Sequence, residues 1–211
     1  AKLGKPILLA TGAANINETI AAVGTILTAN SSVCLMQCNT NYTGSCDNFK
    51  YVNLNVLKTF ATLYPNMPLG FSDHTSGHSA VLGAIALGAR VIEKHFTDDN
   101  LRIGPDHHFA LNAATWRAMI DSSQELWNSL GDGIKRVEGN ELDTVIIQRR
   151  AIRLCSDKQA GHTLSAKDLE YLRPCPPDAL IPSQTDSCIG KTLKEALPAG
   201  SHLTWASLID V

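Results

Sequence analysis

The sequence predicts an α/β protein in which strand–helix units build a parallel sheet, followed by a small domain of short strands and turns. Over the first two thirds of the chain, short apolar runs alternate with stretches whose apolar residues recur at helical spacing. Each apolar run ends in polar residues, and the final third contains several prolines and an internal repeat. Short continuous apolar strands that alternate with helices are typical of a parallel sheet covered by helices on both faces.

The composition is that of a folded protein without a strong charge. Of 211 residues, 44% are hydrophobic and 18% are charged, and the formal net charge is −2. These values exclude wholesale disorder, and the lack of a positive field disfavours nucleic acid as a partner. Apolar stretches such as Ala80–Ala89 are too short and too interrupted by glycine to span a membrane. The start lacks the apolar core of a secretory signal, so we expect a soluble, cytoplasmic protein.

The first two strand–helix units are predicted before residue 64. Ile7–Ala10 is a short apolar run closed by Thr11-Gly12, and Asn15–Thr28 carries apolar residues at helical spacing. Val33–Met36 is the second run, and the polar loop Asn39–Asp47 follows it. The next helical stretch is expected to bury Val52, Leu54, Val56, Leu57 and Phe60.

Two further units complete the predicted sheet. Pro68–Phe71 is the third apolar run, and Ser79–Leu87 is a helix rich in Gly and Ala. Val91-Ile92 is the fourth run, and it leads through a polar loop to the helix Ala113–Leu130. Gly131 follows directly and is a helix C-terminal signal.

Four such units amount to half of an eight-stranded (β/α)8 barrel. In such barrels the chemistry lies at the carboxyl ends of the strands, where all four runs place polar residues. An open doubly wound sheet places its ligands by the same rule and is the alternative. Four strands cannot close a barrel. The other half is therefore absent from this chain or supplied by a partner, or else the sheet stays open.

Gly131–Glu141 is polar and reads as a linker or a covering loop. The region that follows it carries an internal duplication. Ala160–Leu169 aligns with Ala199–Leu208, so that a Gly turn, an extended piece and a hydroxyl N-cap recur. Ser165 and Asp168 have the spacing of a capping box. A domain of this size has a marginal core, so we expect it to dock against another surface.

The six cysteines contain no C-x-x-C pair: Cys34, Cys38, Cys46, Cys155, Cys175 and Cys188. We expect them to be small buried hydrophobic residues in a reducing cytosol. A zinc site formed by Cys34, Cys38 and Cys46 is the alternative.

Two histidines are the principal candidates for chemistry, because His74 and His95 each directly follow a predicted strand. The carboxyl ends of neighbouring strands lie close together, so the two imidazoles can meet near the carboxylates Asp73, Glu93 and Asp106. Such a set suits a divalent ion with open positions for water and substrate. The alternative is that each histidine is only hydrogen-bonded. Asp106, in a Gly-Pro turn, is a candidate base or hydroxyl acceptor, or else a local cap.

The motifs Gly70–Thr75, Gly88–Thr97 and Gly104–His107 resemble those of the sialic acid synthase family. The tail, with Tyr171–Pro174 and Ile189–Lys191, resembles the antifreeze-like (SAF, β-clip) domain that ends those enzymes. The resemblance implies the C-terminal part of a (β/α)8 TIM barrel in residues 1–135, a linker in 136–148 and a SAF domain in 149–211. It also implies about four further strands ahead of Lys5-Pro6.

The family joins phosphoenolpyruvate to an N-acetylated hexosamine, N-acetylmannosamine or a relative, and gives a nonulosonic acid and phosphate. By resemblance, His74 and His95 bind Mn²⁺ or Mg²⁺, and the catalytic carboxylates are Glu93 and Asp106. The implied substrate-binding residues are Thr11, Thr40 and Ser72 for phosphoenolpyruvate, Tyr42 and Asp106 for the sugar, and Arg173 for the N-acetyl group. Arg173 would reach the partner's site in a domain-swapped homodimer.

Two positions depart from the family pattern. Tyr42-Thr43 stands where relatives often have Tyr-Pro, and Thr40 stands where some have Asn or Ser. The alternatives to a synthase are a metal-dependent aldolase on a related barrel and a non-catalytic fragment or ice-binding-like module. Charged residues in the tail, such as Lys158 and Asp168, disfavour ice binding. Because half a barrel is missing, we expect these 211 residues alone to show little or no activity.

Overall fold

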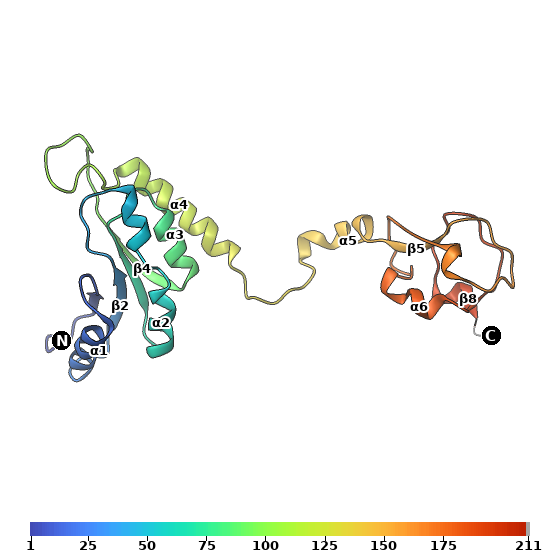
Figure 1. Cartoon of the computed structure of the whole chain (residues 1–211), viewed down its shortest axis with the longest axis horizontal. Helices are drawn as coiled ribbons and strands as arrows, with labels where there is room; N and C mark the ends of the chain where they lie inside the picture. The colour runs from blue at the N-terminus through green and yellow to red at the C-terminus, as the bar shows by residue number, and fades with distance from the viewer. Residues whose placement is uncertain (210–211) are drawn as a thin grey trace. The chain divides into compact units, whose positions relative to one another are not determined.

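The computed structural model describes residues 1–209 of the chain. Within it the chain forms two compact units, Ala1–Gly133 and a second unit that begins at Ile134 (Figure 1). Among residues 1–209, no helix combines the length and the apolar character needed to cross a membrane.

The first unit is built on a four-stranded parallel sheet, as the sequence predicts. Its strands are β1 (Ile7–Ala10), β2 (Val33–Cys38), β3 (Leu69–Asp73) and β4 (Ala89–Lys94), and they pair in the order β1-β2-β3-β4. A doubly wound sheet reverses its strand order at a switch point, and this sheet has no reversal. The doubly wound alternative is therefore wrong.

Helices follow each strand: α1 (Ile16–Leu27), α2 (Val56–Leu63), α3 (Ser79–Ala86) and α4 (Ala113–Ser129). Asn15 caps α1 in a capping box with Glu18. The second helix begins later than expected, because a 3-10 helix at Cys46–Tyr51 precedes it and Asn53 adopts φ +48°. A residue at positive φ interrupts a right-handed helix.

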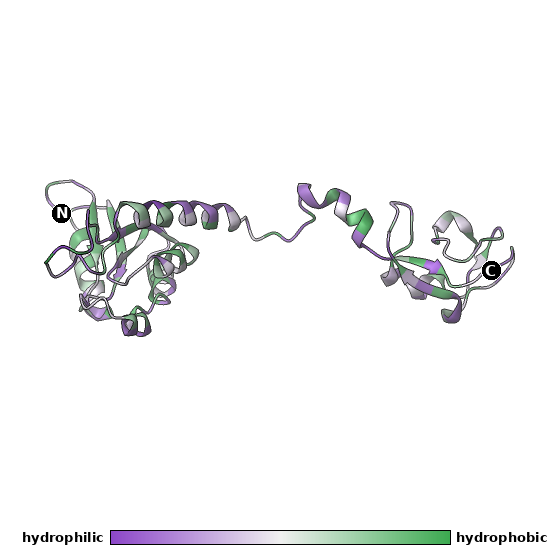
Figure 2. Cartoon of the chain, turned by 90° about the horizontal axis from the view of Figure 1, so that it is seen from above, coloured by the Kyte–Doolittle hydropathy of each residue, from purple (hydrophilic) through white to green (hydrophobic). Residues whose placement is uncertain are grey.

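The sheet packs its helical layer on one face. Because parallel crossovers are right-handed, a strand order without reversal places the helices on the same side. Leu35, Leu57, Phe60 and Phe71 form the centre of this core and are almost completely buried. The strands are largely apolar in Figure 2. On the other face Leu8 is 54% exposed, so the expectation of helices on both faces is wrong.

The second unit contains two antiparallel strand pairs. β5 (Ala151–Leu154) pairs with β6 (Leu169–Leu172), and β7 (Thr192–Leu193) pairs with β8 (Leu208–Ile209). Two short helices complete the unit: α5 (Leu142–Gln148) and α6 (Thr185–Cys188). The Ile146 carbonyl of α5 accepts a hydrogen bond from the Cys175 amide at 2.8 Å, so α5 is attached to this unit.

The predicted duplication is confirmed in three dimensions. In each copy a capping box, Ser165 with Asp168 or Thr204 with Ser207, opens a 3-10 helix that leads into a strand. Leu164 of the first copy and its counterpart in the second copy are 2% and 0% exposed and share one core. The aligned leucines are therefore the centre of a domain with internal pseudo-symmetry.

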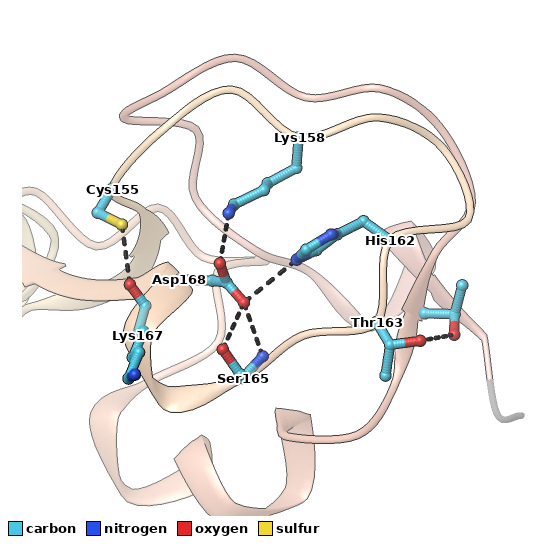
Figure 3. Close-up of polar contacts among 8 residues, drawn as sticks. Cys155, Lys158, His162, Thr163, Ser165, Lys167 and Asp168 are labelled. Carbon is cyan, nitrogen blue, oxygen red and sulfur yellow. Dashed lines mark hydrogen bonds and ion pairs between the residues drawn. The ribbon is translucent and has the colours of Figure 1, made fainter.

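Asp168 gathers the polar contacts of the first copy (Figure 3). Its carboxylate pairs with Lys158 and accepts hydrogen bonds from the Ser165 hydroxyl at 2.7 Å and the Ser165 amide at 2.8 Å. His162 Nε2 lies 3.2 Å from the same carboxylate. The hydrogen bond from Lys158, followed by those from Ser165, holds the pKa of Asp168 well below its usual value. This network ties the turn before the capping box to the capping box itself.

Candidate active site

His74 and His95 lie next to each other at the carboxyl edge of the sheet. Their ring centroids are 5.1 Å apart. Ser72 pairs with Glu93 in the register of β3 and β4, and the histidines follow these residues by two positions. Side chains two apart along a strand point to the same face, so His74 and His95 share a face with Ser72 and Glu93.

The Tyr42 ring completes this aromatic cluster. Its centroid lies 4.5 Å from that of His74 and 5.6 Å from that of His95, edge-on in both cases. His74 is buried, and its Nδ1 lies 3.8 Å from the Cys38 sulfur. Burial, and secondarily the charge on His95, lower the pKa of His74. A lowered pKa leaves the imidazole neutral near pH 7, which is the form that binds metals.

Two of the three candidate carboxylates lie beside the histidines. The Ser72 hydroxyl donates a hydrogen bond to Glu93 Oε1 at 2.8 Å. Asp106 Oδ2 lies 3.4 Å from His95 Nδ1. The third, Asp73, points to the opposite face, where it pairs with Lys94 at 2.6 Å. Burial, the larger effect, lowers the pKa of His74, and the nearby charge of Asp73 opposes that lowering.

His74 and His95 are the side chains at this edge that could hold a divalent ion with several positions left open. Two imidazole nitrogens are available, and within residues 1–209 no cluster of three or more His, Cys, Asp or Glu side chains is arranged to hold a metal. An ion here would take its other ligands from water and substrate oxygens, as catalytic sites do.

The zinc alternative for the cysteines is wrong. Cys34 and Cys38 are four residues apart in β2, which separates them by about 13 Å at about 3.3 Å per residue. Cys38 instead lies within 3.5 Å of the Thr40 hydroxyl. All six cysteines are free, and four of them are buried as expected, whereas Cys46 and Cys155 are exposed.

The residues expected to bind phosphoenolpyruvate differ in whether their hydrogen-bond donors are free to contact it. The Thr11 hydroxyl donates to the Met36 carbonyl at 2.9 Å, and its amide donates to the same oxygen at 3.1 Å. Thr11 therefore has no free donor for a phosphate oxygen in this arrangement. Thr40 is exposed and packs so closely on Gly12 that a Cβ at that position would overlap its hydroxyl.

Two loops meet above the histidines, a contact that the sequence did not reveal. His108 Nε2 lies 3.2 Å from the Thr43 carbonyl oxygen. Gly44, at φ +62°, approaches Phe109 so closely that a Cβ would lie 2.7 Å from the Phe109 Cβ. The Phe109 ring in turn lies 5.2 Å from the His95 ring. The loop that carries Tyr42 is thus held against the loop that follows β4.

Arg173 belongs to the second unit, in the loop that follows β6. It is exposed and precedes a cis peptide bond to Pro174. Arg150 donates to the Tyr171 carbonyl at 2.7 Å, and Arg153 donates to the Pro174 carbonyl at 2.7 Å. These two arginines fix the backbone on either side of Arg173.

These observations define the class: an α/β chain with a reversal-free parallel sheet and titratable side chains gathered at the carboxyl ends of its strands. Comparison with known proteins agrees with this class and specifies it. A model of the NeuB family matches residues 1–135, and the chain belongs to this family. The resemblance to sialic acid synthases inferred from the motifs is thereby confirmed.

Three relatives illustrate the similarity. The chain is 33% identical to the N,N'-diacetyllegionaminic acid synthase of Legionella pneumophila over 95% of its own length and 56% of the relative's. It is 33% identical to the synthase of the same name from Campylobacter jejuni, over 82% and 52% of the two lengths. A solved spore coat polysaccharide biosynthesis protein E from Chromobacterium violaceum has a similar fold, with a TM-score of 0.69 and 22% identity over 98% and 61% of the two chains. The chain spans little more than half the length of these relatives.

Proposed function

We propose that the protein that carries this chain condenses phosphoenolpyruvate with an N-acetylated hexosamine to form a nonulosonic acid and phosphate. The observation that supports it most is the approach of the His74 and His95 rings, 5.1 Å between centroids, in a chain of the NeuB family. The relatives named legionaminic and pseudaminic acid synthases support a product of the nonulosonic class. The acceptor is N-acetylmannosamine or a 6-deoxy relative.

A divalent ion, Mn²⁺ or Mg²⁺, fits the two imidazoles and would polarise the aldehyde oxygen of the sugar. In the reaction, C3 of phosphoenolpyruvate bonds to the aldehyde carbon, water adds at C2, and the C2–O bond to phosphate breaks. Glu93, aligned by Ser72, accepts the proton of the attacking water. Asp106 and Tyr42 orient the sugar, because they flank the same two imidazoles.

The second unit is proposed to be an antifreeze-like domain that serves as a lid. Its internal duplication and paired short strands support that fold. Arg173, exposed and with its backbone held on both sides, would reach the N-acetyl group in the site of a second copy. The assembly would then be a domain-swapped homodimer.

A cytoplasmic location is also proposed. Its support is chemical: the six cysteines are all free thiols. Free thiols persist in a reducing compartment, whereas secreted proteins use cysteines for disulfides.

Phosphate release tests the proposed reaction. The assay supplies phosphoenolpyruvate, Mn²⁺ and either N-acetylmannosamine or its diacetylated 6-deoxy relative. It compares the 211-residue chain with a fusion in which the amino-terminal part of the Legionella synthase precedes Ala1. We expect turnover by the fusion, little or none by the chain alone, and none by fusions that carry His74→Ala or His95→Ala.

Two outcomes would contradict the proposal. Unchanged phosphate release by a metal-stripped His74→Ala fusion would remove the metal from the mechanism. Reversible aldol cleavage without phosphate release would identify the metal-dependent aldolase instead.

A further inference from the structure

A buried ion pair lies on the far side of the sheet from the histidines. Lys94 Nζ is 2.6 Å from Asp73 Oδ2, and the two side chains are 1% and 0% exposed. Asp73 Oδ1 accepts hydrogen bonds from both the amide and the hydroxyl of Thr75 at 2.8 Å, and Lys94 also donates to the Thr75 carbonyl. Every charged atom of the pair is therefore satisfied inside the protein.

The position of this pair in the sheet is what makes it informative. Asp73 and Lys94 are the final paired residues of β3 and β4, and each candidate metal ligand is the next residue along the chain. Thr75, the third member of the network, is the residue after His74. The network thus fixes the backbone on both sides of His74 and directly before His95.

We propose that the buried Lys94–Asp73 pair positions the two histidines by locking the register at the ends of β3 and β4. A slip or splaying of these strand ends would change the separation of the two rings, since each ring is carried one residue beyond the lock. Neither side chain lies on the histidine face of the sheet, so both are positioning residues. Partners outside the ligand shell of metal sites commonly orient the ligands in this way.

The pair is an expensive way to stabilise a fold, because two charges lose their hydration and an apolar pair of similar volume often serves equally well. The ion pair adds directional hydrogen bonds: two from Lys94 and two accepted from Thr75 by Asp73 define one arrangement of the two strand ends. The expected effect of the pair on metal affinity rests on the proposed function. Its expected effect on the separation of the His74 and His95 rings does not.

The test compares two doubly substituted chains. Lys94→Met with Asp73→Asn removes the buried pair without leaving a buried charge unpaired. Lys50→Met with Asp47→Asn makes the same chemical change at an exposed pair, whose side chains are 71% and 73% exposed. Lys94→Gln with Asp73→Asn, which keeps polar partners for Thr75 and leaves no buried charge unpaired, is the milder variant should the first double change prevent folding. Circular dichroism establishes that each variant is folded.

Two readouts are taken on each chain. The first is the set of metal-free ring-to-ring NOEs among Tyr42, His74 and His95, and the second is Mn²⁺ affinity by calorimetry. We expect the buried double variant to lose the His74–His95 NOE and at least tenfold in Mn²⁺ affinity. The exposed control should keep the NOE and stay within about twofold of the unmodified chain's affinity.

The outcomes separate the two proposals. Retention of the ring NOEs in the buried variant would overturn the positioning role, whether or not Mn²⁺ affinity falls. Loss of the NOEs together with no Mn²⁺ binding by the unmodified chain would support positioning and contradict the proposed metal site. Equal effects in the buried and exposed variants would also overturn positioning, because loss of an ion pair anywhere in the chain would then be sufficient.

Discussion

Gly44 offers a quantitative test of the contact between the two loops above the histidines. In Gly44→Ala the new Cβ would lie 2.7 Å from the Phe109 Cβ and 2.8 Å from His108 Nε2, closer than real Cβ contacts. Its φ of +62° adds about 1–2 kcal/mol of backbone strain for a residue other than glycine. Overpacking against a buried residue costs about 1–3 kcal/mol more. The total loss of unfolding free energy should be about 2–5 kcal/mol.

Gly77→Ala is the matched control, because Gly77 has φ +68° but no neighbouring atom within 4 Å of its Cβ position. It should cost only the strain, about 1–2 kcal/mol. Both are measured by urea unfolding with Trp116 and Trp127 fluorescence, in chains where Trp205 of the second unit is Phe. Equal losses for the two glycine variants would refute the loop contact, since the difference between them isolates the steric overlap.

Three further outcomes follow from single side chains. Because the pKa of His74 is lowered, the folded chain binds its proton less readily than the unfolded chain does, so stability should fall as pH drops below about 6.5; urea unfolding of His74→Asn should show less of this pH dependence. Asp168→Asn loses the Lys158 ion pair and should lower the unfolding free energy of the second unit by about 2–3 kcal/mol at pH 7. That loss should shrink below pH 3.8, where the unfolded carboxyl of the native chain gains its proton; thermal melts at pH 7 and pH 2 measure both. Gly12→Ala should displace Thr40 and raise KM for phosphoenolpyruvate in the fusion more than it changes kcat.

The architecture of the first unit was predictable because its strands are short apolar runs with clear ends. The predicted strand Ile7–Ala10 agrees with β1, and the predicted helix Ala113–Leu130 ends one residue beyond α4. The start of α2 was missed because the 3-10 turn and the positive φ of Asn53 leave no periodic trace in the sequence.

The arrangement of the site was only partly predictable. Alternation along a strand places His74 and His95 on one face, so their shared face is predictable from the sequence. The same rule turns Asp73 to the opposite face, next to Lys94, so the alternation is a sequence signal for that pair as well. By contrast, the contact of His108 with Thr43 joins residues 65 positions apart through irregular loops. No helical or strand periodicity in the sequence predicts such a contact between loops.

Paramagnetic broadening by Mn²⁺ tests the central claim most directly. Substoichiometric Mn²⁺ is added to the chain while the imidazole resonances of its seven histidines are followed by NMR. The proposed site predicts that the signals of residues 74 and 95 broaden first and together, and that replacing either ring by alanine protects the other. Broadening of only one of these rings, or of a histidine of the second unit such as His202 before them, would contradict a shared ion at the edge of the sheet.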